Sequence, residues 1–373
     1  MSRADVQAGR IVFAALESYS MVGGLQQFNR RVVSALSSLA ENAHAPHPVV
    51  VLKGDKPTDV ADRPERVRFH ACGASRIQFA RQLLTAVTSA DILLLGHVNL
   101  LPFALLARLR RPRLRVVLFV HGHDVWGTPG TRPVRWWEPL LARSLNRVAS
   151  VSAFTAGRMA KSFRLPASTF SVFPNAVDAL TAAPAKDSSG APHLLTVSRL
   201  AAHDGGKHHD TVLQAMPRIL QEIPEAKYQV IGDGVLRPGL EQMARDLGVA
   251  DSVIFSGRVS DEDLARAYAE AEIFVMPSEK EGFGIVFLEA WQRGLPVICG
   301  TADAAHEVVS DGVDGFAIPH DDPGQLADKV ISLLKDPALA RRMGEAGHDK
   351  VASQYMMPRF TANLDQLLKD VMA

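Results

Sequence analysis

The chain has 373 residues, of which 47% are apolar and 22% are charged. These values exclude a disordered, collagen-like or disulfide-scaffold protein. The length predicts two domains, since a domain usually holds roughly 100–200 residues. Cys72 and Cys299 lie too far apart in the sequence to indicate a disulfide framework or a zinc motif, and they fit a reducing compartment.

The net charge of +1 hides an asymmetry between the two halves. Residues 1–180 hold 23 Lys and Arg against 11 Asp and Glu, a balance of +12, whereas residues 181–373 hold 18 against 29, a balance of −11. A basic half predicts an anionic partner, either nucleic acid or a phospholipid surface. No apolar run reaches the about 20 residues of a membrane-spanning helix, and no signal peptide is apparent, so we expect a cytoplasmic protein.

The first half alternates short apolar runs with amphipathic segments. The runs predict strands, and the amphipathic segments predict helices. The expected strands are Arg10–Leu16, Val49–Lys53, Asp91–Leu95, Arg115–Val120 and Arg147–Val151. The expected helices are Leu25–Ala40, Arg76–Ser89, Leu101–Arg110, Val134–Leu145 and Ala153–Phe163.

A stretch rich in Ala, Ser, Gly and Pro, Pro184–Pro192, reads as an interdomain linker, and the alternation restarts after it. The expected strands are His193–Val197, Lys227–Ile231, Ser252–Phe255, Ile273–Met276 and Pro296–Cys299. The expected helices are Thr211–Ile223, Leu236–Leu247, Asp261–Glu270, Ile285–Arg293 and Pro323–Leu334, followed by a mostly helical tail with a break at Pro358.

This order of elements predicts two Rossmann-like, doubly wound α/β domains in tandem, covering residues 1–180 and 181–356, with 357–373 as a final helix. Ligands of open α/β sheets bind beyond the carboxyl ends of the strands. We therefore expect the two domains to face each other across a cleft that holds the ligand.

Two loops of the first half follow predicted strands. Gly23 and Gly24 precede a helix, where they allow close backbone approach to an anionic ligand, although a plain tight turn is the alternative. His121 follows a strand and is either a site residue or a loop histidine. Trp126, Trp136 and Trp137 have Arg132 and Arg135 among them. This group either stacks on a sugar, lies at a membrane headgroup layer, or packs a helix onto the domain.

An arginine cluster follows an apolar run and suggests docking on an anionic membrane, with a solvated turn as the alternative. Its members are Arg108, Arg110, Arg111, Arg113 and Arg115. Nucleic acid is not expected as a partner, because aromatic residues are sparse around the cluster.

Cations follow the first predicted strand of the second half. Arg199 and Lys207 are suited to neutralise a diphosphate, or are solvated loop residues. The neighbouring His203, Asp204, His208, His209 and Asp210 match no metal-ligand spacing, so no metal is expected. Gly232 and Gly234 form another strand-to-helix turn that either approaches a ligand or is structural.

The segment 277–290 carries the strongest pattern. Glu281 and Glu289 are eight positions apart. This spacing is close to two turns of an α-helix, which together span about 7.2 residues. Between them, Gly282 and Gly284 precede a helix whose first free N–H groups, at Gly284–Val286, suit phosphate oxygens. Two surface glutamates on an ordinary helix are the alternative, but their apolar neighbours argue that this turn is buried.

With these motifs the sequence resembles the retaining glycosyltransferases of family 4, which have the GT-B fold. The segment Glu281–Glu289 matches that family's E-x7-E motif. Further matches are Ser198-Arg199-Leu200, Gly257-Arg258-Val259, Glu307-Val308-Val309, Gly23-Gly24, His121-Gly122 and Val151-Ser152.

The resemblance implies roles for these residues. Arg199 and Lys207 hold the donor diphosphate, Glu281 contacts the transferred sugar, Glu289 binds the ribose and His121 lies by the reaction centre. Further donor-binding positions are Gly23, Gly24, Gly232, Gly234, Arg258, Gly282, Phe283, Gly284, Ile285 and Val286. The resemblance also implies a C-terminal helix that crosses back to the first domain, a lipid-linked acceptor at the cytoplasmic membrane face, and no metal or other cofactor.

Some positions depart from the family pattern. Lys207 lies eight positions after Arg199, which makes this loop longer than usual, and His208 follows where glycine is typical. Ala176 and His306 replace a typical glycine and proline. Two other functions stay open at this point: a nucleotide-sugar epimerase of the same fold, and a non-catalytic nucleotide-sugar-binding protein.

Overall fold

The computed structural model describes residues 10–60, 63–128, 130–180 and 190–373, and for 203–205 it describes the backbone alone. Most of the expected linker, and the side chains of His203 and Asp204, therefore lie outside the described residues. Contacts divide the chain into two compact units, Met1–Ala176 with Met357–Ala373, and Val177–Met356. The backbone N–H of Val177 donates to the carbonyl of Tyr355 at 2.8 Å, which ties together the two ends of the second unit.

The first unit contains a seven-stranded parallel sheet in the order β3-β2-β1-β4-β5-β6-β7. Its strands are β1 (Ile11–Leu16), β2 (Val49–Lys53), β3 (Arg68–Ala71), β4 (Ile92–Leu95), β5 (Arg115–Val120), β6 (Arg147–Ser150) and β7 (Phe170–Val172). Its helices are α1 (Gly24–Asn42), α2 (Arg76–Ala86), α3 (Leu101–Arg110), α4 (Glu138–Ala142), α5 (Ala153–Phe163) and α13 (Met357–Met372).

The second unit contains a six-stranded parallel sheet in the order β10-β9-β8-β11-β12-β13. Its strands are β8 (His193–Val197), β9 (Lys227–Ile231), β10 (Val253–Gly257), β11 (Ala271–Met276), β12 (Val297–Gly300) and β13 (Gly315–Ile318). Its helices are α6 (His209–Glu222), α7 (Arg237–Asp246), α8 (Asp261–Glu270), α9 (Ile285–Trp291), α10 (Ala305–Val308), α11 (Pro323–Lys335) and α12 (Pro337–Gln354).

Both sheets confirm the predicted Rossmann-like architecture. The central strands are apolar throughout because helices cover both faces of a parallel sheet; β4, for example, is completely buried. In each unit the first strand of the sheet lies beside the fourth, β1 beside β4 and β8 beside β11. The chain turns in opposite directions from these two strands, so the point between them is where doubly wound sheets bind ligands.

Two predicted helices differ from the structure. The expected helix Val134–Leu145 is wrong in extent, because α4 begins only at Glu138, whose buried carboxylate binds Arg132 in the preceding irregular segment. The tail breaks at Tyr355–Met356 rather than at Pro358. Pro358 lies in the first turn of α13, where a missing N–H costs no helical hydrogen bond.

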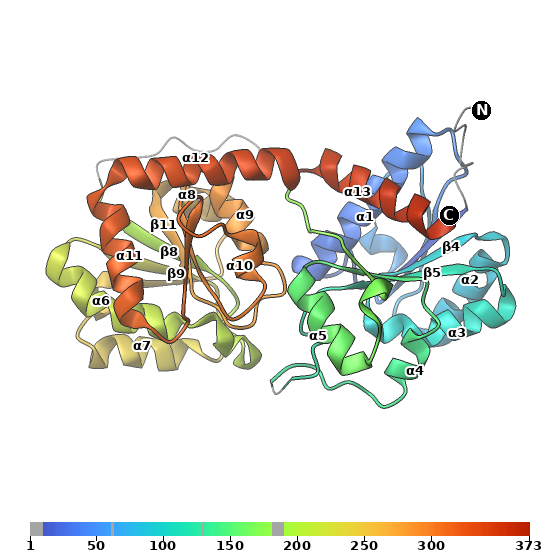
Figure 1. Cartoon of the computed structure of the whole chain (residues 1–373), viewed down its shortest axis with the longest axis horizontal. Coiled ribbons are helices and arrows are strands. Elements are labelled where there is room, and N and C mark those ends of the chain that lie inside the picture. The colour runs from blue at the N-terminus through green and yellow to red at the C-terminus, as the bar shows by residue number, and fades with distance from the viewer. Residues whose placement is uncertain (1–9, 61–62, 129, 181–189) are drawn as a thin grey trace. The chain divides into compact units, whose positions relative to one another are not determined.

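The C-terminal helix α13 belongs to the first unit and packs beside α1 (Figure 1). Phe360 is 1% exposed. Its ring meets those of Phe28 and Phe173 edge-on, with centroids 5.7 and 4.8 Å away. An aromatic cluster thus joins the two ends of the chain in one core.

We predict that Phe360→Ala lowers the free energy of unfolding of the first unit by about 3–5 kcal/mol, because it leaves a cavity among these aromatic rings. Chemical denaturation measures the change. Arg359→Ala, at the exposed neighbouring position, is the control and is expected to have little effect. Equal stability of the two variants would show that α13 contributes little to this core.

Candidate active site

The second sheet brings Arg199, Lys207 and Glu281 to its carboxyl edge. Arg199 follows β8, Lys207 ends the short helical turn Ala202–Lys207 before α6, and Glu281 lies in the loop between β11 and α9. Since β8 and β11 are neighbours, these loops lie at the point where the chain reverses its winding. The predicted ligand-binding position and the predicted residues therefore coincide in this unit.

Lys207 and Glu281 form a direct ion pair between the ammonium Nζ and the carboxylate Oε2. Their side chains are only 15% and 21% exposed, so water screens the pair incompletely. The sequence predicted both residues for one site but not that they touch, because 74 positions separate them.

Buried Asp303 holds the loop that carries Glu281. Its carboxylate accepts hydrogen bonds from the Glu281 backbone N–H at 2.6 Å, the Ser278 hydroxyl at 2.7 Å and the Ala305 N–H at 2.8 Å. Burial, with a smaller contribution from the nearby Glu281 charge, raises the pKa of Asp303 to about 7. The sequence analysis missed this residue, because no motif marks an aspartate that acts through loop backbone.

Buried His209 similarly supports the loop of Arg199. One ring nitrogen lies 2.8 Å from the Ser198 hydroxyl and the other 3.0 Å from the Tyr228 hydroxyl. Burial above all, and the nearby charge of Lys207, lower the pKa of His209 to about 4. The ring is therefore neutral at pH 7, and it positions the residue next to Arg199 without adding charge.

Gly232 and Gly234 let the loop after β9 pack against the loop of Arg199. A Cβ on Gly232 would lie 1.7 Å from the Ser198 carbonyl oxygen, and one on Gly234 would lie 2.3 Å from that of Leu200. Both glycines have positive φ, which disfavours side chains independently of space. Their role in the structure is close backbone packing, and contact with a donor stays a prediction.

The segment after Glu281 is buried, as its apolar composition indicated. Gly284 has φ +93°, and a Cβ there would lie 2.4 Å from the Phe287 ring. Phe283 is 6% exposed and meets Tyr355 edge-on, so its side chain packs in the core. Gly282 is also buried, whereas Ile285 and Val286, in the first turn of α9, are half-buried.

Glu289 lies in the second turn of α9 and is half-buried, whereas Glu281 lies in the loop before this helix, so the expected spacing of two helical turns between the two carboxylates is wrong. It accepts a hydrogen bond from the Tyr268 hydroxyl at 3.1 Å, while Arg293 lies over the Tyr268 ring. Tyr268 thus fixes the orientation of this carboxylate. Arg199 and Arg258 lie at the exposed surface of the same sheet edge, after β8 and β10.

In the first unit, His121 lies at the carboxyl end of β5, as predicted. Its Nε2 lies 3.0 Å from the Gly96 carbonyl, which can only accept, so Nε2 carries the hydrogen. The ring packs edge-on against Phe28, in the second turn of α1. The Asp124 carboxylate accepts from the N–H groups of His121 and Gly122 and shapes this turn.

Gly23 ends the loop that follows β1, and Gly24 is the first residue of α1. Three consecutive backbone N–H groups of this loop, at Ser18, Tyr19 and Ser20, donate to the buried carboxylate of Asp55 at 2.7–2.8 Å. Gly24 begins α1, and nothing lies within 4 Å of the position of a Cβ there. Asp55 is a second loop-holding aspartate that the sequence analysis missed.

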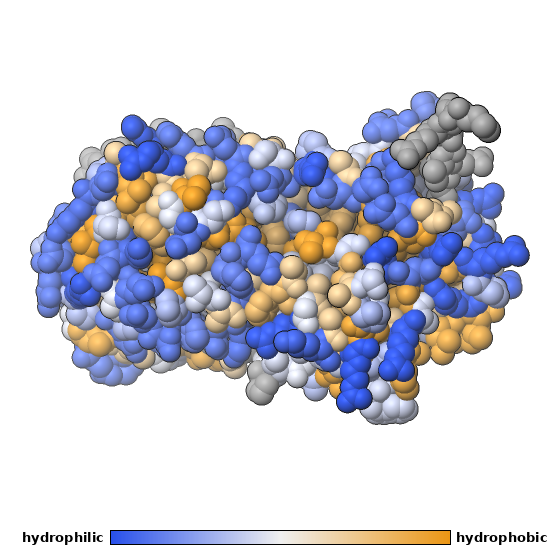
Figure 2. Space-filling view, in the orientation of Figure 1, coloured by the Kyte–Doolittle hydropathy of each residue, from blue (hydrophilic) through white to orange (hydrophobic). Residues whose placement is uncertain are grey.

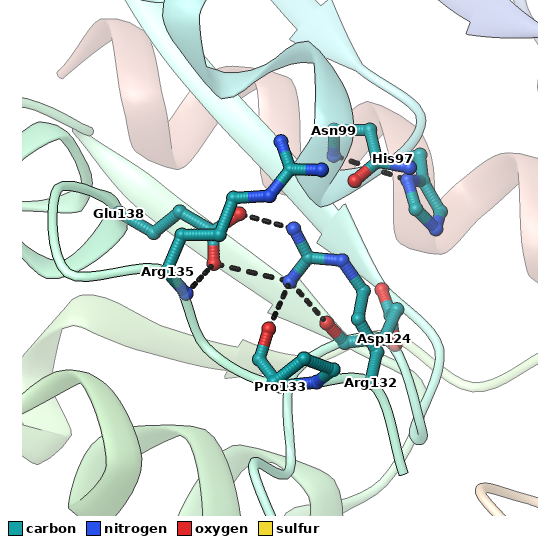
Figure 3. A network of polar contacts seen from close by, with 7 residues as sticks. All are labelled: His97, Asn99, Asp124, Arg132, Pro133, Arg135 and Glu138. Carbon is teal, nitrogen blue, oxygen red and sulfur yellow. Dashed lines mark hydrogen bonds and ion pairs between the residues drawn. The ribbon is translucent and has the colours of Figure 1, made fainter.

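The tryptophan segment divides into buried and exposed parts. Trp126 is 4% exposed and donates to the Thr155 hydroxyl. Arg132 binds the buried carboxylate of Glu138 and the carbonyls of Asp124 and Pro133, which supports the packing interpretation for this residue (Figure 3). Trp136, by contrast, is 82% exposed.

These observations define a two-unit α/β protein with Rossmann-like sheets and a charged loop cluster on the second. Two family models cover most of the chain: "Glycosyltransferase Family 4" matches residues 22–179, and "Glycosyl transferases group 1" matches residues 183–350. A "GDP-mannose-dependent alpha-(1-6)-phosphatidylinositol monomannoside mannosyltransferase" of Mycolicibacterium smegmatis is 31% identical over 72% of this chain and 74% of its own length. The chain belongs to glycosyltransferase family 4.

Other similar proteins agree with this assignment. A "D-inositol 3-phosphate glycosyltransferase" of Streptomyces avermitilis is 36% identical over 38% of this chain and 32% of its own length. Among solved structures, sucrose-phosphate synthase of Thermosynechococcus elongatus has a TM-score of 0.77 at 19% identity, over 97% of this chain and 99% of its own. Anabaena HepE with UDP and glucose has a TM-score of 0.74 at 17% identity, over the same shares. The fold is therefore GT-B, and the protein is a glycosyltransferase.

We predict that Asp303 makes the second unit less stable as pH rises from about 4 to 7, between the ordinary pKa of an aspartate and its raised pKa in the fold. A carboxyl whose folded pKa is raised stabilises the fold fully only at low pH, and that contribution is lost as pH rises through its folded pKa of about 7. The slope reaches at most about 1.4 kcal/mol per pH unit. Unfolding free energies of wild type and Asp303→Asn measure it, and parallel pH profiles of the two proteins would contradict the assignment.

Proposed function

We propose that the protein transfers a hexose from a nucleotide-diphosphate sugar to a hydroxyl acceptor, with retention at the anomeric carbon. The observation that carries this proposal is the ion pair of Lys207 with Glu281, in the same group of loops as Arg199, at the carboxyl edge of the second sheet. This group of side chains combines two cations that can bind a diphosphate with a carboxylate that can accept hydrogen bonds from sugar hydroxyls. Family membership supports the reaction class.

In this proposal Arg199 and Lys207 bind the diphosphate. The phosphate oxygens replace the Glu281 carboxylate as partner of the Lys207 ammonium, and Glu281 then accepts hydrogen bonds from the sugar. Glu289, oriented by Tyr268, accepts from the ribose hydroxyls. Donor binding thus replaces the single ion pair of Lys207 and Glu281 with several contacts to the donor. The bound donor therefore holds the loop of Glu281 in place, and the loop holds the donor.

The chemistry follows from where charge develops. The bond between the anomeric carbon and the diphosphate oxygen breaks, which leaves a cationic sugar and an additional negative charge on the diphosphate. Arg199 and Lys207 stabilise that charge. The acceptor oxygen forms its bond to the anomeric carbon on the same face, and its proton passes to the leaving phosphate. In this proposal His121 contacts the transferred sugar through Nδ1, because its other ring nitrogen, Nε2, faces the Gly96 carbonyl.

The fixed cations make a catalytic metal unnecessary for leaving-group stabilisation. Guanidinium and ammonium groups supply the positive charge that Mg²⁺ provides in other phosphate sites. We therefore propose that transfer continues in excess EDTA.

The similar proteins suggest the substrates. Four mycobacterial and corynebacterial relatives are named as GDP-mannose-dependent enzymes that act on phosphatidylinositol mannosides. We propose GDP-mannose as donor and a phosphoinositol-type lipid as acceptor, in the assembly of a cell-surface glycolipid or polysaccharide at the cytoplasmic face of the membrane. Within the described residues, none of the helices contains an apolar stretch of the length that spans a bilayer.

The surface around α3 suits a lipid acceptor. Leu105, Leu106 and Leu109 are 44%, 42% and 73% exposed on this helix, and Figure 2 shows a hydrophobic area over α3 bordered by hydrophilic side chains. Of the five clustered arginines, Arg108 and Arg111 bind Asn146 and Asp91 within the unit. The remaining exposed arginines, available to lipid phosphates, are Arg110, Arg113 and Arg115.

We predict that Arg199→Ala and Lys207→Ala each lower the transfer rate by about 10²–10³. The assay follows mannose transfer from GDP-mannose to a phosphoinositol lipid, and NMR of the product reports the anomeric configuration. Lys335→Ala, which removes an exposed lysine paired with Glu222 in the same unit, is the control. An inverted product would overturn the retaining mechanism, and nucleotide release that needs no acceptor would favour an epimerase.

We predict that the protein floats with anionic liposomes at low salt and that replacing Arg110, Arg113 and Arg115 with glutamine reduces the bound fraction. Each arginine near an anionic surface contributes about 1 kcal/mol. The control replaces Arg218, Arg245 and Arg341 of the second unit with glutamine, because this variant loses the same number of positive charges. If wild type stays unbound, or if both triple variants bind equally, this surface does not dock on lipid.

A further inference from the structure

Three side chains with metal-ligating atoms meet at the carboxyl edge of the second sheet. They are His208 before α6, Glu279 after β11 and His320 after β13. His208 Nε2 lies 3.7 Å from one Glu279 oxygen, and His320 Nε2 lies 3.5 Å from the other. The two imidazole rings lie beside each other, with centroids 4.5 Å apart.

Hydrogen bonds independent of these side chains already hold the three segments together. The backbone N–H of Glu279 donates to the Gly206 carbonyl at 2.9 Å, next to the Lys207–His208 segment. The Thr211 hydroxyl, in the first turn of α6, donates to the His320 carbonyl at 2.6 Å. The group is therefore preorganised, as a metal site requires.

His208 shows two further features that packing alone does not explain. Its φ of +54° lies in the left-handed region, where glycine is favoured and a side chain is disfavoured. Its Nε2 is buried and has no hydrogen-bond partner, an arrangement that is costly unless something fills it. Its other nitrogen lies 3.6 Å from an Asp210 oxygen, the kind of carboxylate that orients metal-binding histidines.

We propose that His208, Glu279 and His320 bind one divalent transition-metal cation of the Zn²⁺ class. Two imidazoles and a carboxylate are a ligand set that such cations favour over Mg²⁺ or Ca²⁺, which prefer oxygen. Ligand atoms about 2.0–2.1 Å from a tetrahedral ion lie about 3.3 Å apart, close to the observed 3.5 and 3.7 Å. The side chains are 17–31% exposed, so the ion can enter and keep a water ligand.

The cation would link three loops of the second unit. His208 follows Lys207 directly, and Glu279 precedes Glu281 by two positions. The ion therefore stabilises the framework of the donor site without taking part in the transfer, so this inference does not depend on the proposed reaction. Lys280, whose ammonium lies 3.2 Å from a Glu279 oxygen, competes with the ion for that carboxylate.

The test uses the untagged full chain, stripped with a chelator, and calorimetric titration with Zn²⁺. We expect one equivalent to bind and to raise the melting temperature, and Co²⁺ to give the intense visible absorption of a tetrahedral site. His208→Gly, His320→Ala and Glu279→Gln each lower the affinity at least tenfold, whereas Lys280→Met raises it. His348→Ala, which removes an exposed histidine of α12, leaves binding unchanged.

His208→Gly keeps the test independent of folding, because glycine is favoured at this φ and the variant is expected to fold at least as well as wild type. No stoichiometric Zn²⁺ binding by wild type would overturn the proposal. Binding of equal affinity in the three ligand variants would also overturn it, since the ion would then lie elsewhere. Mg²⁺ replacing Zn²⁺ at equal affinity would contradict the ligand assignment.

Discussion

The contact on which the proposed site depends is the half-buried ion pair of Lys207 and Glu281. Each charge has lost part of its hydration, which is costly unless an opposite charge lies close by. The pair therefore keeps an ammonium and a carboxylate in place while no ligand is bound. In the proposed mechanism, a diphosphate sugar replaces this internal contact, with phosphate oxygens on the Lys207 ammonium and sugar hydroxyls on the Glu281 carboxylate.

Buried polar residues behind the loops make this arrangement possible. Asp303 holds the Glu281 loop through the Glu281 backbone N–H and the Ser278 hydroxyl. His209 holds Ser198 beside Arg199. Asp55 holds the loop that leads to Gly23 and Gly24 in the first unit through three backbone N–H groups. The two aspartates accept hydrogen bonds from backbone N–H groups that no strand pairs at the sheet edge, whereas His209 acts through the Ser198 hydroxyl. The parallel sheets supply the scaffold, and these residues determine the shape of its edge.

The positions of the central strands and of most helices could be predicted from the sequence, because the buried central strands are continuous apolar runs. The strands it missed, β3, β7 and β13, are sheet edges of three or four residues, too short for a periodic pattern. The motifs of Arg199 and Glu281 predicted one site, and the structure places both residues in loops after the neighbouring strands β8 and β11, while their contact with a donor stays a prediction. Asp303 and the group of His208, Glu279 and His320 were not predicted, because only folding brings residues so far apart in the chain into contact.

The most direct test is a crystal structure of the full chain with bound GDP. We expect diphosphate oxygens within about 3.2 Å of Lys207 Nζ and of the Arg199 guanidinium, with Glu281 no longer paired to Lys207. A diphosphate bound to other residues, with the ion pair of Lys207 and Glu281 intact, would contradict the account.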